Sequence, residues 1–581
     1  MSDIFLRLVA FVPERTRVHV AKFAGDPKSV RNWITHLPLT NADLCARQLL
    51  DALRDMNKQR LEPAARLESL ELLRAPLTQL QSVLDVRARG DSFPLPSVKR
   101  QSMDVAQDLQ HEMSVAYVVA LYDFCAPAGD VPFMKGKSVA LAGARALQHI
   151  GMQLARAYLL YLAPAPGVWR MLHRVFLFLD EAGQTERMLD DPLPGGGQLN
   201  ARHAYLQCLL LALNNPYRLT QKENIVAFQL ARAWAPHCSL ERDATIPGGL
   251  GVDMNGDNGP GYLEQERSRP EAHEWSFHYD ELEKRLHAEI GKLPPNISTL
   301  SYHIKGAPDF NVDVTLVRSM MHAWYDARMR VHQRLAAGYK LDSILGLHAA
   351  HFVLAGNRGF ESFLQTMAET SISLTDREDA APWVNSATDN PAIRRLHATV
   401  LDQSLGGYRV IWPAAENLRA RIGELVILAP AALADEAQDW MVGVMRWLRI
   451  HADSSVEAGI ELLARRAKPA SLRSYDDERH LRPPMRALLL DSLGEDSLPA
   501  TVLTPPLLER HLERVELTVP RDIYDEKPEA HVEVITDLDV INDTGTYLRF
   551  AWNPPASPDG PDAPDPAELS AAGLDELSSV A

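Results

Sequence analysis

The sequence predicts a multi-domain α+β protein, with a helical bundle or helical-hairpin array in its N-terminal and central parts and antiparallel β-barrels in its C-terminal part. The chain has 581 residues, several times the roughly 100–150 residues of a typical domain. Apolar residues recur with a helical period from about residue 40 to 236, and short strand-like runs follow from about 393 to 550. These three observations require more than one hydrophobic core.

The helical prediction begins at Asn41, a residue type that caps helices, followed by Leu44, Leu49 and Leu53 on one face. Pro63 stands where the first turn of a second helix tolerates proline. Further amphipathic blocks run near residues 98–124, 138–162, 167–182, 198–214 and 220–235. No clean repeat of about 34 residues is present, so a tetratricopeptide array is not predicted. Two interpretations stay open: a protein-binding scaffold, or simply an all-α domain.

The composition divides the chain further. We predict an α-helical domain at residues 1–240, and a mixed loop-rich and helical region at 241–380 with helical patterns near 277–290, 311–336 and 343–368. Two β-rich segments are predicted at 381–466 and 467–553, and an acidic, disordered tail at 554–581.

Charge and cysteine content exclude several classes of protein. A formal net charge of −16 argues against wrapping of generic nucleic acid, which needs a basic surface. The four cysteines form no CxxC pair, so we predict neither disulfides nor a zinc site, and a reducing cytoplasm as the location. No signal peptide and no apolar run of about 18 residues is visible, so we predict no membrane span.

Motifs of enzymes and metal sites are missing or incomplete. Gly136-Lys137-Ser138 lacks the first glycine of a phosphate-binding loop. The segment from Asp253 to Glu264 has oxygens at calcium-loop spacing, but Asn258 stands where the turn needs glycine. Neither a G-x-S-x-G nor an H-E-x-x-H pattern occurs, so we predict that the chain is not an enzyme and holds no metal or cofactor. A site assembled from the 240–310 loops is the weakest alternative.

One segment in the β-rich part carries a recognisable pattern. Asp402, Ser404 and Gly407 lie at a predicted turn between the strand-like runs 396–401 and 408–412. Aspartate and serine side chains order turns by hydrogen bonds, and glycine lets the backbone approach a ligand. The same residues could equally form an ordinary tight turn.

The pattern Asp402-x-Ser404-x-x-Gly407 resembles the D-x-S-x-x-G motif of PilZ domains, small β-barrels that bind cyclic di-GMP in bacterial signalling. Residues 418–428 are similar to a further strand of this family, 442–448 to its V-x-W strand, and 458–463 to its G-I/V-E-F/L strand. The resemblance covers about residues 393–466. It implies a PilZ-like barrel at this place and cyclic di-GMP as the possible ligand.

The resemblance departs from the family at one place. PilZ domains that bind cyclic di-GMP usually carry an R-x-x-x-R loop upstream, whose guanidinium groups clamp the phosphates. Arg377 stands alone among acidic residues, and Arg394-Arg395 lies too close to Asp402. The resemblance therefore implies Asp402, Ser404 and Gly407 as contacts of the ligand, with Arg394, Arg395 and Arg446 as substitute phosphate partners.

These observations predict a bacterial signalling or adaptor protein. Its PilZ-like domain would bind cyclic di-GMP and relay the signal to a protein partner through the helical region. The alternative is a helical scaffold or chaperone-like adaptor without a ligand, in which the barrel serves only as an interaction module.

Overall fold

The computed structural model describes the chain except for residues 1–2, 16–22, 91, 243–248, 264–272, 295–296, 307, 327–334, 369–392, 415–417, 432–438, 476–479, 493–499, 522–529 and 553–581. The predicted tail, Arg377 and part of the calcium-like segment lie outside the described residues. The chain forms two compact units, of which the first takes in Met1–Leu341, Leu396–Gly423 and Met445–Glu461. The second takes in Asp342–Arg395, Glu424–Val444 and Leu462–Ala581.

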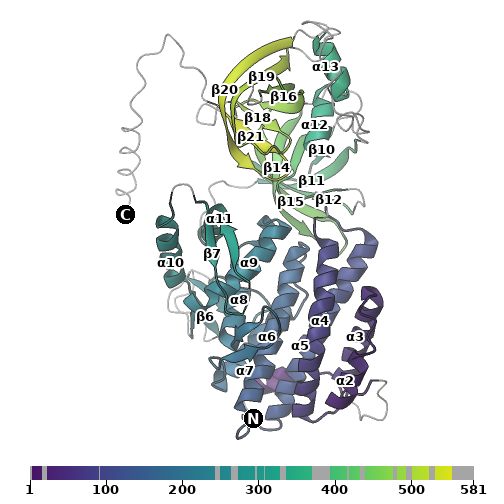
Figure 1. The fold of residues 1–581 in the computed structure, drawn as a ribbon, viewed down its shortest axis with the longest axis vertical. Coiled ribbons are helices and arrows are strands. Elements are labelled where there is room, and N and C mark those ends of the chain that lie inside the picture. Colours follow the sequence, from purple (N-terminus) through teal and green to yellow (C-terminus); the bar gives the residue numbers. More distant parts are fainter. Residues whose placement is uncertain are drawn as a thin grey trace. The chain divides into compact units, whose positions relative to one another are not determined.

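The first unit begins with packed helices, of which α4, α5 and α6 run side by side (Figure 1). The helices are α1 (Asp3–Leu8), α2 (Pro27–Ile34), α3 (Ala42–Asn57), α4 (Pro63–Ala88), α5 (Ser97–Cys125), α6 (Gly136–Leu159), α7 (Val168–Glu181), α8 (Ala201–Leu213) and α9 (Gln221–Trp234). Asn41 caps α3 by accepting from the backbone N–H of Leu44 at 3.1 Å, as its place in the sequence predicts.

Small sheets follow the helices. Strands β3 (Ser239–Glu241), β6 (Glu274–His278), β4 (Leu250–Asp253) and β5 (Gly261–Tyr262) form one sheet in that order, and β7 (Thr299–Tyr302) pairs with β8 (Phe310–Asp313). Helices α10 (Asp280–Gly291) and α11 (Val314–Asp326) accompany them. The helix that the sequence predicts near residues 277–290 is therefore present, as α10.

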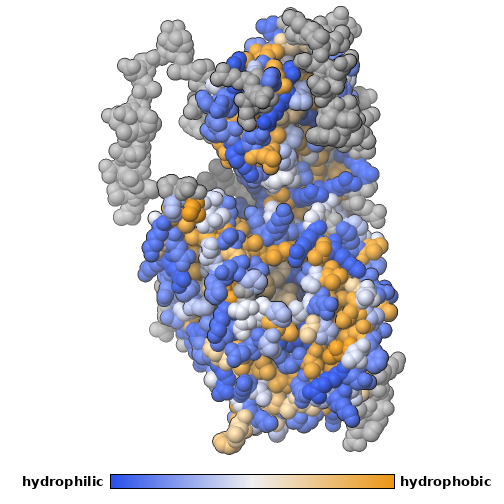
Figure 2. Space-filling view, in the orientation of Figure 1, coloured by the Kyte–Doolittle hydropathy of each residue, from blue (hydrophilic) through white to orange (hydrophobic). Residues whose placement is uncertain are grey.

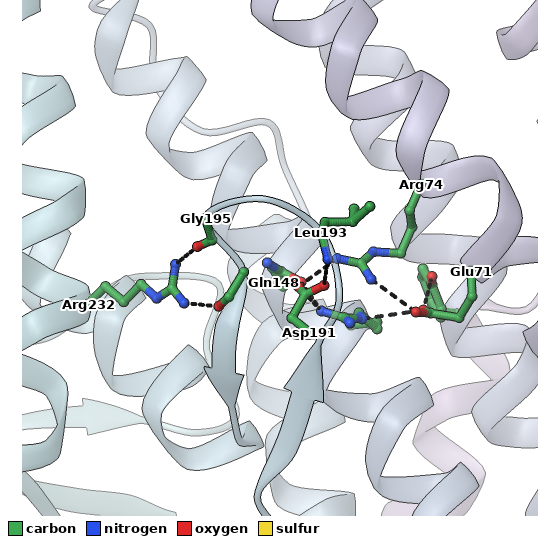
Figure 3. Close-up of polar contacts among 10 residues, drawn as sticks. Glu71, Arg74, Gln148, Asp191, Leu193, Gly195 and Arg232 are labelled. Carbon is green, nitrogen blue, oxygen red and sulfur yellow. Dashed lines mark hydrogen bonds and ion pairs between the residues drawn. The ribbon is translucent and has the colours of Figure 1, made fainter. Parts of the chain in front are cut away.

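A buried cluster of charges fastens a hairpin to the helices (Figure 3). The hairpin consists of β1 (Leu189–Asp191) and β2 (Gly197–Leu199). The Asp191 side chain is 1% exposed, and its Oδ2 accepts from Arg74 at 2.7 Å and from Arg145 at 2.6 Å. Both arginines also contact Glu71, whose side chain is 25% exposed. A single carboxylate of the hairpin thus satisfies two buried cations from α4 and α6.

The turn of the hairpin is held separately. Arg232 of α9 donates to the backbone oxygens of Gly195 and Gly196, the first over 2.8 Å (Figure 3). The Asp191 Oδ1 accepts from the backbone N–H of Leu193 at 3.1 Å. Ion pairs and hydrogen bonds therefore join the hairpin to three helices, α4, α6 and α9.

The four cysteines are free and buried: Cys45, Cys125, Cys208 and Cys238. Burial raises the pKa of the Cys208 thiol to about 12. Among the described residues, no helix combines the length and the apolar character that crossing a bilayer requires.

The first barrel is a seven-stranded sheet in the order β10-β13-β14-β15-β12-β11-β9, closed by the pairing of β10 with β11. Its strands are β9 (Leu335–Ala336), β10 (Lys340–Leu345), β11 (Leu396–Ser404), β12 (Gly407–Trp412), β13 (Leu425–Pro430), β14 (Met441–Ile450) and β15 (Val456–Ala464). Two of these strands precede residue 381, where the sequence places the start of the barrel.

The helical prediction for residues 343–368 is wrong at its beginning. Residues 340–345 form β10, and the helices that follow are α12 (Leu347–Leu354) and α13 (Phe360–Ala368). Ile344 belongs to the strand, while Leu347 and Ala350 belong to α12, yet all three join one hydrophobic core. Their spacing of three therefore imitates a single helix across the boundary.

The second barrel is closed in the order β16-β17-β18-β21-β20-β19. Its strands are β16 (Ala467–Ser474), β17 (Met485–Leu490), β18 (Thr501–Thr504), β19 (His511–Pro520), β20 (Ala530–Asp543) and β21 (Leu548–Ala551). Its interior is apolar and includes Leu472, Val502, Leu517 and Phe550. The β-rich fold predicted for the C-terminal part is confirmed.

We predict that Asp191→Asn lowers the free energy of unfolding by about 3 kcal/mol, because it removes the more deeply buried of the two carboxylates that Arg74 and Arg145 share. Urea denaturation followed by circular dichroism at pH 7 measures this. Asp190→Asn, an exposed neighbour in the same strand, should change the value by less than about 0.5 kcal/mol. Equal effects of the two variants would contradict the role of Asp191 as the buried partner of Arg74 and Arg145.

The difference in the free energy of unfolding between the wild type and Asp191→Asn should depend on pH. Burial alone would raise the pKa of Asp191, but hydrogen bonds and charges from Arg74 and Arg145 outweigh it and lower the pKa to about 2. The ordinary unfolded value is about 3.9, so the stabilisation is complete above that pH and is lost as the pH falls towards 2. The difference between the wild type and Asp191→Asn should narrow over this interval.

Candidate functional site

The predicted turn is shorter than the sequence suggests. Asp402 and Ser404 belong to β11, and Gly407 opens β12, so that the turn consists of residues 405 and 406 alone. Ser404 pairs with Gly407 and Asp402 with Arg409 across the two strands. The motif is therefore the end of a β-hairpin, and its polar side chains stand on a sheet.

An irregularity in β11 decides which face of the sheet Asp402 occupies. Val400 pairs with Val410, and both are fully buried, but the next pair is Asp402 with Arg409. Leu401 is thus an extra residue. Successive side chains of a strand point to opposite faces, so without it Asp402 would point inwards with Val400. The bulge turns Asp402 to the outer face, as bulges at functional sites do.

Spacing then assigns the other motif residues to the same face. Ser404 lies two residues after Asp402, and Gly407 is opposite Ser404. On the neighbouring strand β15, Gly459 is opposite Arg409 and Glu457 is opposite Ile411. The outer face therefore presents a carboxylate, a hydroxyl and a guanidinium, with glycines between them.

The two glycines are required by close approaches. A Cβ on Gly407 would lie 2.0 Å from the backbone oxygen of Ile460, and one on Gly459 would lie 1.8 Å from Nε1 of Trp447. A side chain at position 407 would push β12 away from β15. The indole of Trp447 lies across Gly459. The tryptophan of the V-x-W segment therefore packs on the glycine of the G-I-E segment.

Charges on this face are joined in a chain. The Arg409 Nε donates to Glu457 Oε1 at 2.6 Å, and its Nη1 lies 3.4 Å from Asp402 Oδ2. The second oxygen of Glu457 is 2.7 Å from Nε2 of His451. The Glu457 side chain is 6% exposed, whereas that of Arg409 is 40% exposed. Arg409 is therefore anchored at one edge and accessible at the other.

Arg409 and Glu457 each stabilise the charged form of the other. Burial opposes ionisation of Glu457, but the hydrogen bonds from Arg409 and His451 outweigh it, so that its pKa is lowered. The bond to Glu457 in turn raises the pKa of Arg409. Both groups are thus charged near neutral pH, and the site can attract an anion or accept hydrogen bonds from a base edge.

The arginines proposed from the sequence lie in different places. Arg395 is 3.7 Å from Asp342 and stacks over the ring of Trp440. Arg446 donates twice to Glu461, with Nε–Oε2 at 2.6 Å. Arg394 is exposed and directly precedes Arg395. No described contact brings these three side chains to Asp402 or Ser404.

Strand pairing draws attention to a segment that sequence reasoning missed. Residues 330–334 read Arg-Val-His-Gln-Arg, the spacing of an R-x-x-x-R loop, and they end directly before β9. These residues themselves lie outside the described part. In β9, Leu335 pairs with Gln403 and Ala336 with Asp402.

Other motifs of the sequence have structural roles. The Asp257 carboxylate accepts from the backbone N–H groups of Gly167 at 2.6 Å and Arg170 at 2.9 Å, and so caps α7. His351 is buried in α12, with Nε2 3.2 Å from the backbone oxygen of Ala470. Within the described part of the chain, no cluster of three or more His, Cys, Asp or Glu side chains could hold a metal ion.

Comparison with known proteins matches most of the chain. Residues 28–245 match the model of the N-terminal domain of the cyclic-di-GMP receptor FimW, and residues 250–399 and 375–469 match the model of its middle PilZ domain. The chain is also 25% identical over 552 residues to the cyclic-di-GMP receptor FimW of Pseudomonas aeruginosa, which covers 87% of this chain and 88% of the relative. The resemblance to PilZ domains is confirmed, and the relative is named a receptor.

We predict that Gly407→Ala disrupts the first barrel, because the new methyl group meets the backbone of β15 and has no flexible neighbour to displace. The melting temperature should fall by several degrees for each kcal/mol lost. Gly338→Ala is the matched control, since a Cβ there has nothing within 4 Å. An unchanged melting curve for Gly407→Ala would contradict the register of β12 and β15.

Proposed function

Because the chain carries a FimW-type PilZ domain behind a FimW-type N-terminal domain, we propose that it is a signalling adaptor that binds cyclic di-GMP on the outer face of the first barrel. The observation that supports this best is the bulge at Leu401. It places Asp402, Ser404 and Arg409 together on one face of the sheet, to which Gly407 and Gly459 add no side chains of their own. The named relative binds this ligand according to its description.

Asp402 and Ser404 would receive the hydrogen bonds of one guanine edge, because a carboxylate accepts from two N–H donors at once. Arg330 and Arg334, which have the spacing of an R-x-x-x-R loop in the sequence, would clamp the phosphates. The positive charge of paired guanidinium groups complements the phosphates of a cyclic dinucleotide, and their planar faces can stack on its bases. Arg394, Arg395 and Arg446 are the rival phosphate partners.

The helical part would carry the signal to a protein partner. Figure 2 shows hydrophobic residues gathered over α3 and α4, and the exposed large apolar side chains of these helices are Leu44, Val83 and Val86. Aliphatic side chains exposed together are a usual feature of protein-binding surfaces. The same observation would serve a scaffold without a ligand, which is the second candidate function.

Calorimetric titration of the full chain with cyclic di-GMP tests the ligand. We expect micromolar or tighter binding that weakens roughly 10- to 100-fold in Asp402→Ala and in Ser404→Ala, because each loses hydrogen bonds to the ligand. Gln403→Ala is the matched control, since Gln403 lies between them on the opposite face. No heat at high ligand concentration would leave the scaffold as the better function.

The same titration locates the phosphate clamp. We expect Arg330→Ala and Arg334→Ala each to weaken binding at least tenfold, and more at low salt than at high salt. Arg394→Ala, Arg395→Ala and Arg446→Ala should stay close to the wild type. The reverse pattern would place the clamp at the residues that the sequence alone favours.

A further inference from the structure

Glu457 is a carboxylate with two hydrogen-bonding partners, Arg409 and His451, that belong to different parts of the first unit. One oxygen accepts from Arg409 at 2.6 Å and the other lies 2.7 Å from His451. Its side chain is 6% exposed, so water cannot readily replace either partner. A change in the bond between Glu457 and Arg409 must therefore alter the bond between Glu457 and His451.

The Arg409 side faces the proposed ligand. Glu457 holds the Nε edge of the guanidinium, and the Nη1 atom is directed at Asp402 over 3.4 Å. The side chain is 40% exposed, and an arginine of this exposure would sample many rotamers without an anchor. The position of Arg409 beside the motif thus depends on Glu457.

The His451 side faces the helices. His451 begins the turn between β14 and β15, where its N–H donates to the Ser455 oxygen and its own oxygen accepts from Ser454, each at 2.9 Å. Ser454 has φ +66°, an uncommon conformation for a residue with a side chain. Arg100 of α5 donates to the Ser454 hydroxyl.

Two more contacts hold this turn to the helical part. The Ile450 N–H donates to the backbone oxygen of Tyr161 at 2.8 Å, just beyond the end of α6. The Arg449 guanidinium lies over the ring of Tyr217, 5.1 Å from its centre. The turn is therefore fixed to three helical segments, and all these residues belong to the first unit.

We propose that Glu457 is a positioning residue of the cyclic-dinucleotide site and that, through His451, it couples occupancy of this site to the β14–β15 turn and helix α5. The inference rests on the proposed function. A ligand phosphate near Arg409 competes with Glu457 for the guanidinium. Among the described contacts, the carboxylate then keeps the hydrogen bond to His451, and that bond strengthens. The coupling therefore tightens the turn when the ligand is bound.

Calorimetry and hydrogen exchange on the full chain test this together. In the wild type, saturating cyclic di-GMP should slow amide exchange in residues 449–456 and in residues 97–105 of α5. Glu457→Gln should weaken binding roughly tenfold and abolish the slowing even at saturation. His451→Gln should bind within twofold of the wild type but no longer slow the exchange. If His451 had only a structural role, His451→Gln would not abolish the slowing of exchange while leaving the affinity for the ligand unchanged.

Glu461→Gln is the matched control. It removes a carboxylate from the same strand and an arginine pair of the same 2.6 Å length, yet touches neither Arg409 nor His451. Its exchange response should equal that of the wild type. Absence of binding by the wild type would overturn the proposed function and this inference together. Binding with an unchanged exchange response in His451→Gln and Glu457→Gln would overturn this inference alone.

Discussion

One extra residue in β11 determines what the first barrel can do. Strand side chains alternate between two faces, and Leu401 changes the alternation between Val400 and Asp402. Before it, the strand supplies the barrel interior; after it, the strand supplies polar groups to the outer face. The pairing of Asp402 with Arg409 follows from this register. The anchoring of Arg409 by Glu457 and the need for glycine at positions 407 and 459 come instead from β15 and its neighbours β12 and β14.

The strands of the first barrel that carry the motif could be predicted from the sequence, because four segments in the right order constrain one another. The bulge could not, since a run such as Thr399-Val400-Leu401-Asp402 reads equally well as a regular strand end. Arg446 shows a similar limit. Its place in the V-x-W strand suggested a phosphate partner, whereas its geometry shows a pair with Glu461, a partner that spacing alone does not reveal.

The periodicity of the helical part could be predicted from the sequence, but the ion pairs that join its helices to the β1–β2 hairpin could not. Amphipathic blocks and the cap at Asn41 follow from local rules of spacing and hydrogen bonding. The joining of Arg74, Arg145 and Asp191 depends on residues far apart in the chain. Such long-range ion pairs leave no local pattern, because a buried arginine in a helix has the same spacing as one on a solvated face.

The closure of the first barrel has a consequence for the length of its connections. Strand β10 pairs with β11, although α12, α13 and further residues separate them in sequence. The chain leaves and rejoins the barrel at adjacent positions, so this stretch is topologically a loop. Its closure entropy grows only logarithmically with length, by about 0.6 kcal/mol for each doubling. Extra residues inserted between α13 and β11 would therefore cost little closure entropy, whereas α12 cannot be replaced freely, because Leu347 and Ala350 belong to a hydrophobic core. The number of residues between β10 and β11 therefore says little about their distance in space, because the two strands are paired neighbours.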